Sequence, residues 1–268
     1  MPRLNDIERG TSIIMLAYGG SGVGKTHFCG SAGSRSLIIN IGGGIATLQS
    51  KGFRNNNKDY NPFIETISED AVPTAAKAFD EVCNVIDQYL SKQSGDFDTI
   101  IVDDVTALRR FAMNKGLEIN QKLGKSKSAS TSKMFDIPIV AVQDYGIEMQ
   151  LMESFTLEYI RLCKEANKHL IMTAHERVSF NTPTSIGGEP TINSIKPGFT
   201  GRLFPDAVTG HFDLVWHFEK MGGGEQIKYR ARTIGDNNLT AHTKWSGIFS
   251  ILEPNPNFLD IIKKIKEN

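Results

Sequence analysis

Short apolar runs alternate along the chain with segments whose apolar residues recur every three or four positions. The runs predict buried β-strands over residues 12–18, 37–41, 99–104 and 169–174. The helical spacing predicts α-helices over residues 26–32, 74–90 and 147–168. Because predicted strands and helices alternate in the order β-α-β-α-β-α-β, the pattern favours an α/β fold with a mostly parallel central sheet flanked by helices.

The last part of the chain has a different pattern. Residues 212–218 and 226–233 alternate between apolar and polar positions around a glycine-rich turn, which predicts antiparallel strands on the C-terminal side of the sheet. Residues 258–266 predict a short helix whose basic end suits the helix dipole. With 268 residues and 40% hydrophobic composition, we expect a single domain over residues 1–268 with its core at about 10–250. Composition alone would also permit two small domains.

Charge and cysteine content bear on the partners and the cellular compartment of the protein. Thirty basic residues balance thirty acidic ones, so no global field indicates a nucleic-acid partner and any such surface must be local. Cys29, Cys83 and Cys163 are odd in number and form no C-x-x-C pair, which predicts reduced, buried thiols in a cytoplasmic protein. The first residues lack the apolar core of a signal peptide, and no stretch approaches the roughly 18 apolar residues of a membrane span, so we expect no membrane partner.

A complete G-x-x-x-x-G-K-T motif lies between the first predicted strand and the first predicted helix. In this context the glycines let backbone N–H groups converge on the phosphates of a nucleotide, Lys25 adds positive charge, and the Thr26 hydroxyl is a magnesium ligand. A chance match is the alternative, which the strand context and the acids downstream disfavour. The predicted residues for binding ATP with Mg²⁺ are Gly19, Gly20, Ser21, Gly22, Val23, Gly24, Lys25, Thr26 and His27.

Polar residues end two further predicted strands. Asp103 has the form of the Walker B acid that orients magnesium, and its alternative role is to cap the following helix. Asp104 either polarises the attacking water or caps that helix, and the sequence leaves both open. His175 lies at the end of its strand, where a parallel sheet presents residues to a ligand, and is a candidate γ-phosphate sensor. An ordinary loop histidine is the alternative.

A resemblance to a known family rests on the order and spacing of several motifs. They are the phosphate loop, the strand over residues 99–104, the Thr-Ala-His-Glu sequence at 173–176, residues 201–205 and residues 229–245. Together they resemble the phage-encoded, RecA-like ATPases of the Sak single-strand-annealing type, also called AAA-domain phage proteins. The resemblance covers about residues 10–250.

This resemblance implies a RecA-like P-loop core that binds and anneals or pairs single-stranded DNA during phage recombination. It also implies a homo-oligomer, either a ring or a filament, in the cytoplasm of the host cell. A single-strand-binding protein is a candidate partner.

Two positions depart from the pattern of this family. After the second strand the family has a sequence resembling Asp-Thr-Glu-Gly-Gly, whose Glu activates water, whereas residues 40–44 here read Asn-Ile-Gly-Gly-Gly. Gly42 leaves the usual base missing, and weak hydrolysis is expected. A Lys/Arg pair that reaches a neighbouring subunit's nucleotide in the family matches His242-Thr243-Lys244 here, so Lys244 is the expected contact between subunits.

The resemblance also places DNA at two segments, residues 122–133 and 176–202. The first carries lysines without acids, and the second mixes cations with aromatic rings on which bases can stack. Long segments of this kind are often functional, although a solvated loop and an ordinary connection are the alternatives. The predicted DNA-binding residues are Lys125, Lys127, Lys133, Arg177, Lys196, Phe199 and Arg202.

The sequence thus predicts an ATPase in which Lys25, Asp103, Asp104, His175 and Lys244 act on the nucleotide. The alternative is a nucleotide-regulated scaffold or loader for a replication protein, without direct affinity for DNA. A small-molecule kinase is disfavoured because no arginine-rich lid segment follows the core.

Overall fold

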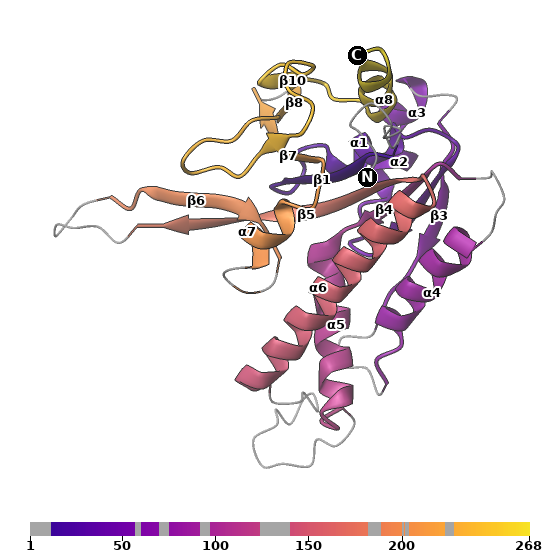
Figure 1. Ribbon diagram of the computed structural model, residues 1–268, viewed down its shortest axis with the longest axis vertical. Helices are drawn as coiled ribbons and strands as arrows, with labels where there is room; N and C mark the ends of the chain where they lie inside the picture. The colour runs from indigo at the N-terminus through magenta and orange to yellow at the C-terminus, as the bar shows by residue number, and fades with distance from the viewer. Residues whose placement is uncertain are drawn as a thin grey trace, which may run out of the picture.

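Parallel strands form the middle of a mixed sheet (Figure 1). The computed structural model describes residues 12–56, 60–69, 75–91, 97–123, 140–181, 189–199, 201, 204–222 and 228–268. The strand order is β10-β8-β7-β1-β5-β4-β2-β3, and the pairings from β7 to β3 are all parallel. The parallel strands are β1 (Ile14–Gly19), β2 (Ser36–Asn40), β3 (Phe63–Thr66), β4 (Thr99–Asp103), β5 (His169–Phe180) and β7 (Leu214–Met221).

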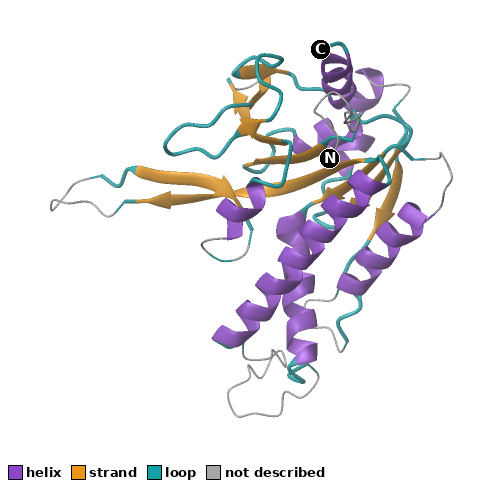
Figure 2. Ribbon diagram, in the orientation of Figure 1, coloured by secondary structure: helices purple, strands orange, loops and turns teal. Residues whose placement is uncertain are grey.

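Helices cover both faces of these strands (Figure 2). Ile14, Leu16 and Tyr18 of β1 share a buried cluster with residues of α4 (Ala78–Ser91), α5 (Val105–Ile119) and α6 (Val142–Glu165). Met15 and Ala17 share another cluster, with residues of α1 (Lys25–Gly30), α2 (Ala46–Gln49), α3 (Lys51–Asn56) and α8 (Phe258–Lys266). Because successive side chains of a strand point to opposite faces, a strand covered on both faces must be apolar throughout.

The predicted antiparallel pair on the C-terminal side is present, because β8 (Lys228–Arg232) pairs antiparallel with β7. Two short antiparallel strands that the sequence did not predict lie beside it: β9 (His242–Thr243) pairs with β7, and β10 (Leu252–Pro254) pairs with β8. Their positions confirm the predicted α/β fold class, with a mostly parallel central sheet and antiparallel strands on one side.

A two-stranded hairpin projects from the body of the molecule (Figure 1). The second half of β5 continues beyond the sheet and pairs antiparallel with β6 (Ile192–Pro197), from Glu176↔Pro197 to Phe180↔Ile192. We call residues 176–180 and 192–197 the hairpin arm. Residues 176–202, the second segment at which the resemblance places DNA, were expected to be a loop, and these parts of the segment form strands instead. After the arm the chain enters α7 (Phe204–Thr209).

Some helices and strands differ from the predicted ones. Helix α6 begins at Val142, earlier than the predicted residue 147. The predicted ranges also leave out α5, the short helices α2, α3 and α7, and strands β3 and β6. Cys29, Cys83 and Cys163 are free thiols; Cys29 and Cys163 are buried as predicted, whereas Cys83 is only half-buried. Among the helices in the described ranges, none is both long enough and apolar enough to cross a membrane.

Candidate nucleotide-binding site

The phosphate loop connects the end of β1 to the start of α1. Gly22 and Gly24 have φ angles of 71° and 93°, a left-handed conformation that favours glycine. A Cβ atom at Gly19 would lie 2.4 Å from the Phe218 carbonyl oxygen of β7, so the loop also begins where no side chain fits. The sequence therefore specifies this loop through glycines that its backbone requires.

Lys25 is buried under the loop. Its Nζ donates hydrogen bonds to the Gly19 and Gly20 carbonyl oxygens, at 2.9 and 2.7 Å. Burial lowers the pKa of Lys25, and the nearby carboxylates of Asp104 and Asp103 oppose this shift. The ammonium group is thus held at the loop by backbone carbonyls, close to two acids.

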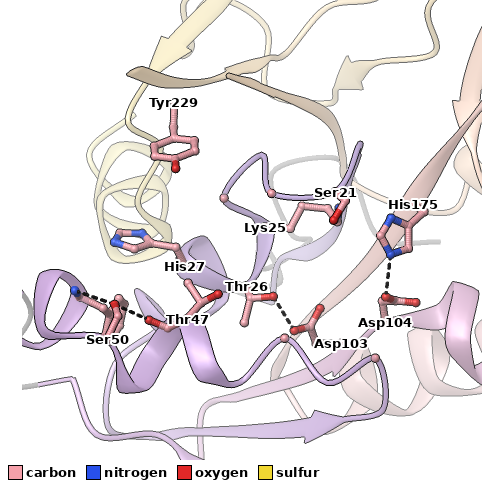
Figure 3. A pocket seen from close by; sticks show the side chains of 15 residues that line it. Ser21, Lys25, Thr26, His27, Thr47, Ser50, Asp103, Asp104, His175 and Tyr229 are labelled. Atoms are coloured by element: carbon pink, nitrogen blue, oxygen red, sulfur yellow. Dashed lines mark hydrogen bonds and ion pairs between the residues drawn. The ribbon is translucent and has the colours of Figure 1, made fainter. Parts of the chain in front are cut away.

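Asp103 joins the loop to the neighbouring strands. Its Oδ2 accepts a hydrogen bond from Thr26 Oγ1 at 2.8 Å (Figure 3). Its Oδ1 accepts one from Thr173 Oγ1 of β5 at 2.5 Å. A hydroxyl and a carboxylate next to each other offer the oxygen donors that Mg²⁺ prefers, so the residues fit a magnesium site. Thr173, which the sequence reasoning missed, fixes the orientation of the carboxylate.

Asp104 caps α5 and also faces His175. Its Oδ1 accepts the Ala107 N–H at 2.6 Å, while its Oδ2 lies 3.4 Å from His175 Nε2 (Figure 3). Burial raises the pKa of Asp104, while the Ala107 N–H and His175 favour the charged form. The cap that the sequence left open as an alternative is therefore present, and one carboxylate oxygen remains directed at His175.

Gly42 explains how the second carboxylate fits. A Cβ atom at Gly42 would lie 2.7 Å from Asp104 Oδ2, closer than real side-chain contacts allow. The Asp104 carboxylate therefore occupies the space that a side chain at position 42 would need.

His175 lies on β5 directly opposite Gly19 of β1. Its backbone N–H donates to Thr106 Oγ1 at 2.9 Å, and its side chain is 45% exposed and lines the pocket. The prediction that the strand ends here is wrong, because β5 continues to Phe180. His175 nevertheless lies level with the end of β1, at the edge of the parallel sheet that faces the pocket. Its role as a phosphate sensor stays a prediction.

These elements enclose a pocket of about 600 Å³. The charged end holds Lys25, Thr26, Asp103, Asp104 and His175. The rest of the wall comes from the loop, the segment after β2, and β8, and comprises Ser21, Gly22, Gly24, His27, Gly42, Gly44, Thr47, Ser50, Phe53 and Tyr229. Sequence reasoning did not find Tyr229, because alternation along β8 does not reveal that this residue faces the phosphate loop.

Lys244 lies at the opposite edge of the sheet. Its Nζ is 3.1 Å from Asp213 Oδ1, and Asp213 Oδ2 accepts the backbone N–H of Ile14 at the start of β1. Within this chain Lys244 is therefore remote from the phosphate loop, which follows the other end of β1. The contact of Lys244 with a neighbouring subunit stays a prediction.

The predicted DNA-binding residues have different outcomes. Lys125, Lys127, Lys133 and Arg202 lie outside the described residues. On the hairpin arm, Arg177 donates to the Gly201 carbonyl oxygen, and Lys196 pairs with Asp206 at 2.8 Å.

Phe199 cannot stack on a base in this conformation. It is fully buried, and its ring packs edge to face against Phe204 at 5.4 Å between centroids. The prediction of Phe199 as a DNA contact is wrong because the chain after β6 turns back to the sheet, where the Gly198 N–H donates to the His175 carbonyl oxygen. The exposed ring is that of Phe180, which is 59% exposed on the arm.

A comparison with protein families agrees with the phosphate loop. A family model described as an AAA domain matches residues 11–234, and the chain belongs to this family. It is a P-loop NTPase.

Two solved structures align over most of the chain. The flagellar accessory protein FlaH from Methanocaldococcus jannaschii is 12% identical, with a TM-score of 0.42 over 94% of this chain and 89% of the other. The RadB recombinase is 13% identical, with a TM-score of 0.39 over 82% of this chain and 79% of the other. Among curated proteins, none matches the sequence.

Proposed function

We propose that the chain binds ATP with Mg²⁺ in the pocket beside the phosphate loop and hydrolyses it slowly, and that it acts on single-stranded DNA. The observation that carries the nucleotide part is the convergence of Lys25, Thr26 and Asp103 at the carboxyl ends of β1 and β4. These are the three side chains that the chemistry of a P-loop site requires.

Each of these side chains has a specific role. Lys25 binds the terminal phosphates, and its carbonyl partners in the loop keep its ammonium group in position. Thr26 and Asp103 would hold Mg²⁺, which neutralises phosphate charge when bound. Thr173 keeps the Asp103 carboxylate turned toward Thr26.

Asp104 and His175 are our candidates for handling the attacking water and the γ-phosphate. Asp104 keeps Oδ2 free of the helix cap and directed toward His175, at the place that Gly42 leaves open. Asp104 polarises the water and His175 senses the terminal phosphate. Because the cap occupies the other carboxylate oxygen, we expect turnover to be slow.

Single-stranded DNA is the proposed macromolecular partner. We propose that the chain forms a homo-oligomer that acts in phage recombination in the cytoplasm of the host cell. A single-strand-binding protein is a further proposed partner. The resemblance in sequence supports this assignment. The hairpin arm adds an exposed Phe180 ring near the cations Arg177 and Lys196, a combination suited to a flexible single strand. Lys244 is proposed to contact the nucleotide of a neighbouring subunit.

A nucleotide-regulated scaffold or loader without DNA affinity is the second candidate. Two observations favour it: Phe199 is buried, and Lys196 is already paired with Asp206. Both reduce the number of free groups that the arm offers to DNA.

ATP turnover measured with and without single-stranded DNA tests the proposal. We expect a low basal rate that DNA changes, and an Asp104→Asn variant about 10²- to 10⁴-fold slower. An ATP-binding protein that neither binds DNA at low salt nor changes its turnover would support the scaffold instead.

A further inference from the structure

The pocket extends beyond the side chains that handle phosphates. Figure 3 shows Asp104 and His175 at one side of the phosphate loop, and Tyr229 and His27 at the other. A smaller cavity of about 60 Å³ continues from there and also includes Gly24, His27 and Tyr229. The pocket therefore has an acidic end and an aromatic end, joined by the loop.

Tyr229 packs directly on the loop. A Cβ atom at Gly24 would lie 3.1 Å from Cδ1 and 3.4 Å from Cγ of the Tyr229 ring, so the ring covers this glycine at contact distance. The residue is nevertheless 39% exposed and lines both cavities. One part of the ring contacts the loop, and another part faces the pocket.

The backbone holds Tyr229 firmly in this position. Tyr229 pairs with Lys220 of β7 in the antiparallel ladder, and its carbonyl oxygen accepts the Asn255 N–H at 2.8 Å. Asn255, just beyond β10, has a φ angle of 44° and lines the smaller cavity together with Tyr229. An exposed aromatic ring on a paired strand loses little conformational freedom when a ligand covers it.

His27 forms the neighbouring part of the wall. It follows Thr26, so its side chain lies where the chain leaves the phosphate-binding residues. Its ring packs edge to face on Phe53, with 5.0 Å between centroids. The aromatic end is therefore built from β8, α1 and α3 together.

We infer that the nucleobase of the bound nucleotide stacks on the Tyr229 ring, next to His27. This inference rests on the proposed nucleotide binding, and it assigns the end of the pocket that the phosphates do not occupy. A flat ring can stack on any base, because every base presents a π-face. The ligand is thus a nucleoside triphosphate held at both ends, by charge at Lys25 and by stacking at Tyr229.

Calorimetry with two ligands tests the inference, because inorganic tripolyphosphate carries the phosphates without a base. Both ligands are titrated with Mg²⁺ into the wild type, Tyr229→Ala, Tyr229→Phe and Lys25→Ala. Tyr229→Ala should weaken ATP binding roughly 5- to 150-fold and leave tripolyphosphate binding within about twofold. Tyr229→Phe should keep ATP binding, and Lys25→Ala should weaken both ligands.

Tyr145→Ala is the matched control, because this tyrosine is 52% exposed on α6 and does not line the pocket. A second measurement uses Tyr229→Trp, whose fluorescence ATP should quench and tripolyphosphate should not. The inference is overturned if Tyr229→Ala weakens both ligands equally, which would mean that the ring only supports the loop. It is also overturned if ATP binding is unchanged or the new tryptophan is not quenched. A wild type that binds neither ligand would instead refute the proposed nucleotide binding.

Discussion

Gly42 and Gly44, which follow β2, lie next to Asp104 and Asp103 respectively. Replacing each glycine with alanine therefore perturbs one of the two acids at a time. Neither Gly42 nor Gly44 has a positive φ angle, so alanine fits the backbone at both positions. At Gly42 the new Cβ would lie 2.7 Å from Asp104 Oδ2, whereas ordinary contacts begin at 3.4 Å. The carboxylate must therefore retreat by about 0.7 Å or rotate away. At Gly44 the new Cβ would lie 2.5 Å from Thr26 Oγ1 and 3.3 Å from Asp103 Oδ2.

The two substitutions should have different effects. A misplacement of about 1 Å in a catalytic group can reduce the rate on the order of 10²-fold, so we expect Gly42→Ala to lower ATP turnover by about this factor. Disturbing the α5 cap should also lower the free energy of unfolding by about 0.5–2 kcal/mol. ATP binding should persist, because Lys25, Thr26 and Asp103 are untouched. Gly44→Ala should instead weaken binding that depends on Mg²⁺.

Steady-state turnover, calorimetric ATP affinity and thermal unfolding would be measured for both variants. Gly146→Ala is the control, because no atom lies within 4 Å of the added Cβ and the residue is inside α6. If Gly42→Ala turns over ATP as fast as the wild type, Asp104 does not act on the water. If Gly42→Ala abolishes ATP binding while Gly44→Ala leaves it intact, the assignment of the two acids is reversed.

Three further predictions concern stability and DNA. Burial lowers the pKa of His169 to about 4, so unfolding takes up a proton between pH 6.5 and 4. The free energy of unfolding should therefore fall by about 3 kcal/mol as the pH drops through this window. In chemical denaturation at several pH values, His169→Asn should show a weaker pH dependence. Phe199→Ala should cost about 3–5 kcal/mol of stability because the ring is fully buried, whereas Phe180→Ala should leave stability unchanged and weaken single-stranded DNA binding in fluorescence anisotropy. Replacing Lys125, Lys127 and Lys133 with Ala should reduce the salt slope of DNA binding by roughly 0.7 for each lost phosphate contact, and an unchanged slope would remove these lysines from the interface.

The sequence predicted best those segments in which a single physical requirement decides the choice of residues. The buried strands were predictable because both faces must be apolar, and the phosphate loop because its backbone requires glycine. Helix α5 had a visible signal in its Asp104 cap and in the helical spacing of Val105, Leu108 and Phe111. Strand β3 had none, since its four residues are exposed at the edge of the sheet.

Side chains whose role depends on contacts distant in sequence were not predictable. In the sequence, Phe199 looks like an aromatic residue of a loop. The structure buries it because the chain after β6 returns to the sheet. Thr173 reads as one more residue of an apolar strand, although it orients Asp103 across 70 residues. Tyr229 belongs to the pocket only because β8 pairs with β7 beside the loop.

ATP binding by the wild type and Lys25→Ala tests the central claim most directly. Calorimetry with and without Mg²⁺ should show binding by the wild type that Mg²⁺ strengthens. Lys25→Ala should reduce the affinity about 10- to 100-fold, the value of a lost charge-assisted contact, with an unchanged unfolding midpoint. Equal ATP affinity in the wild type and a folded Lys25→Ala variant would contradict the account.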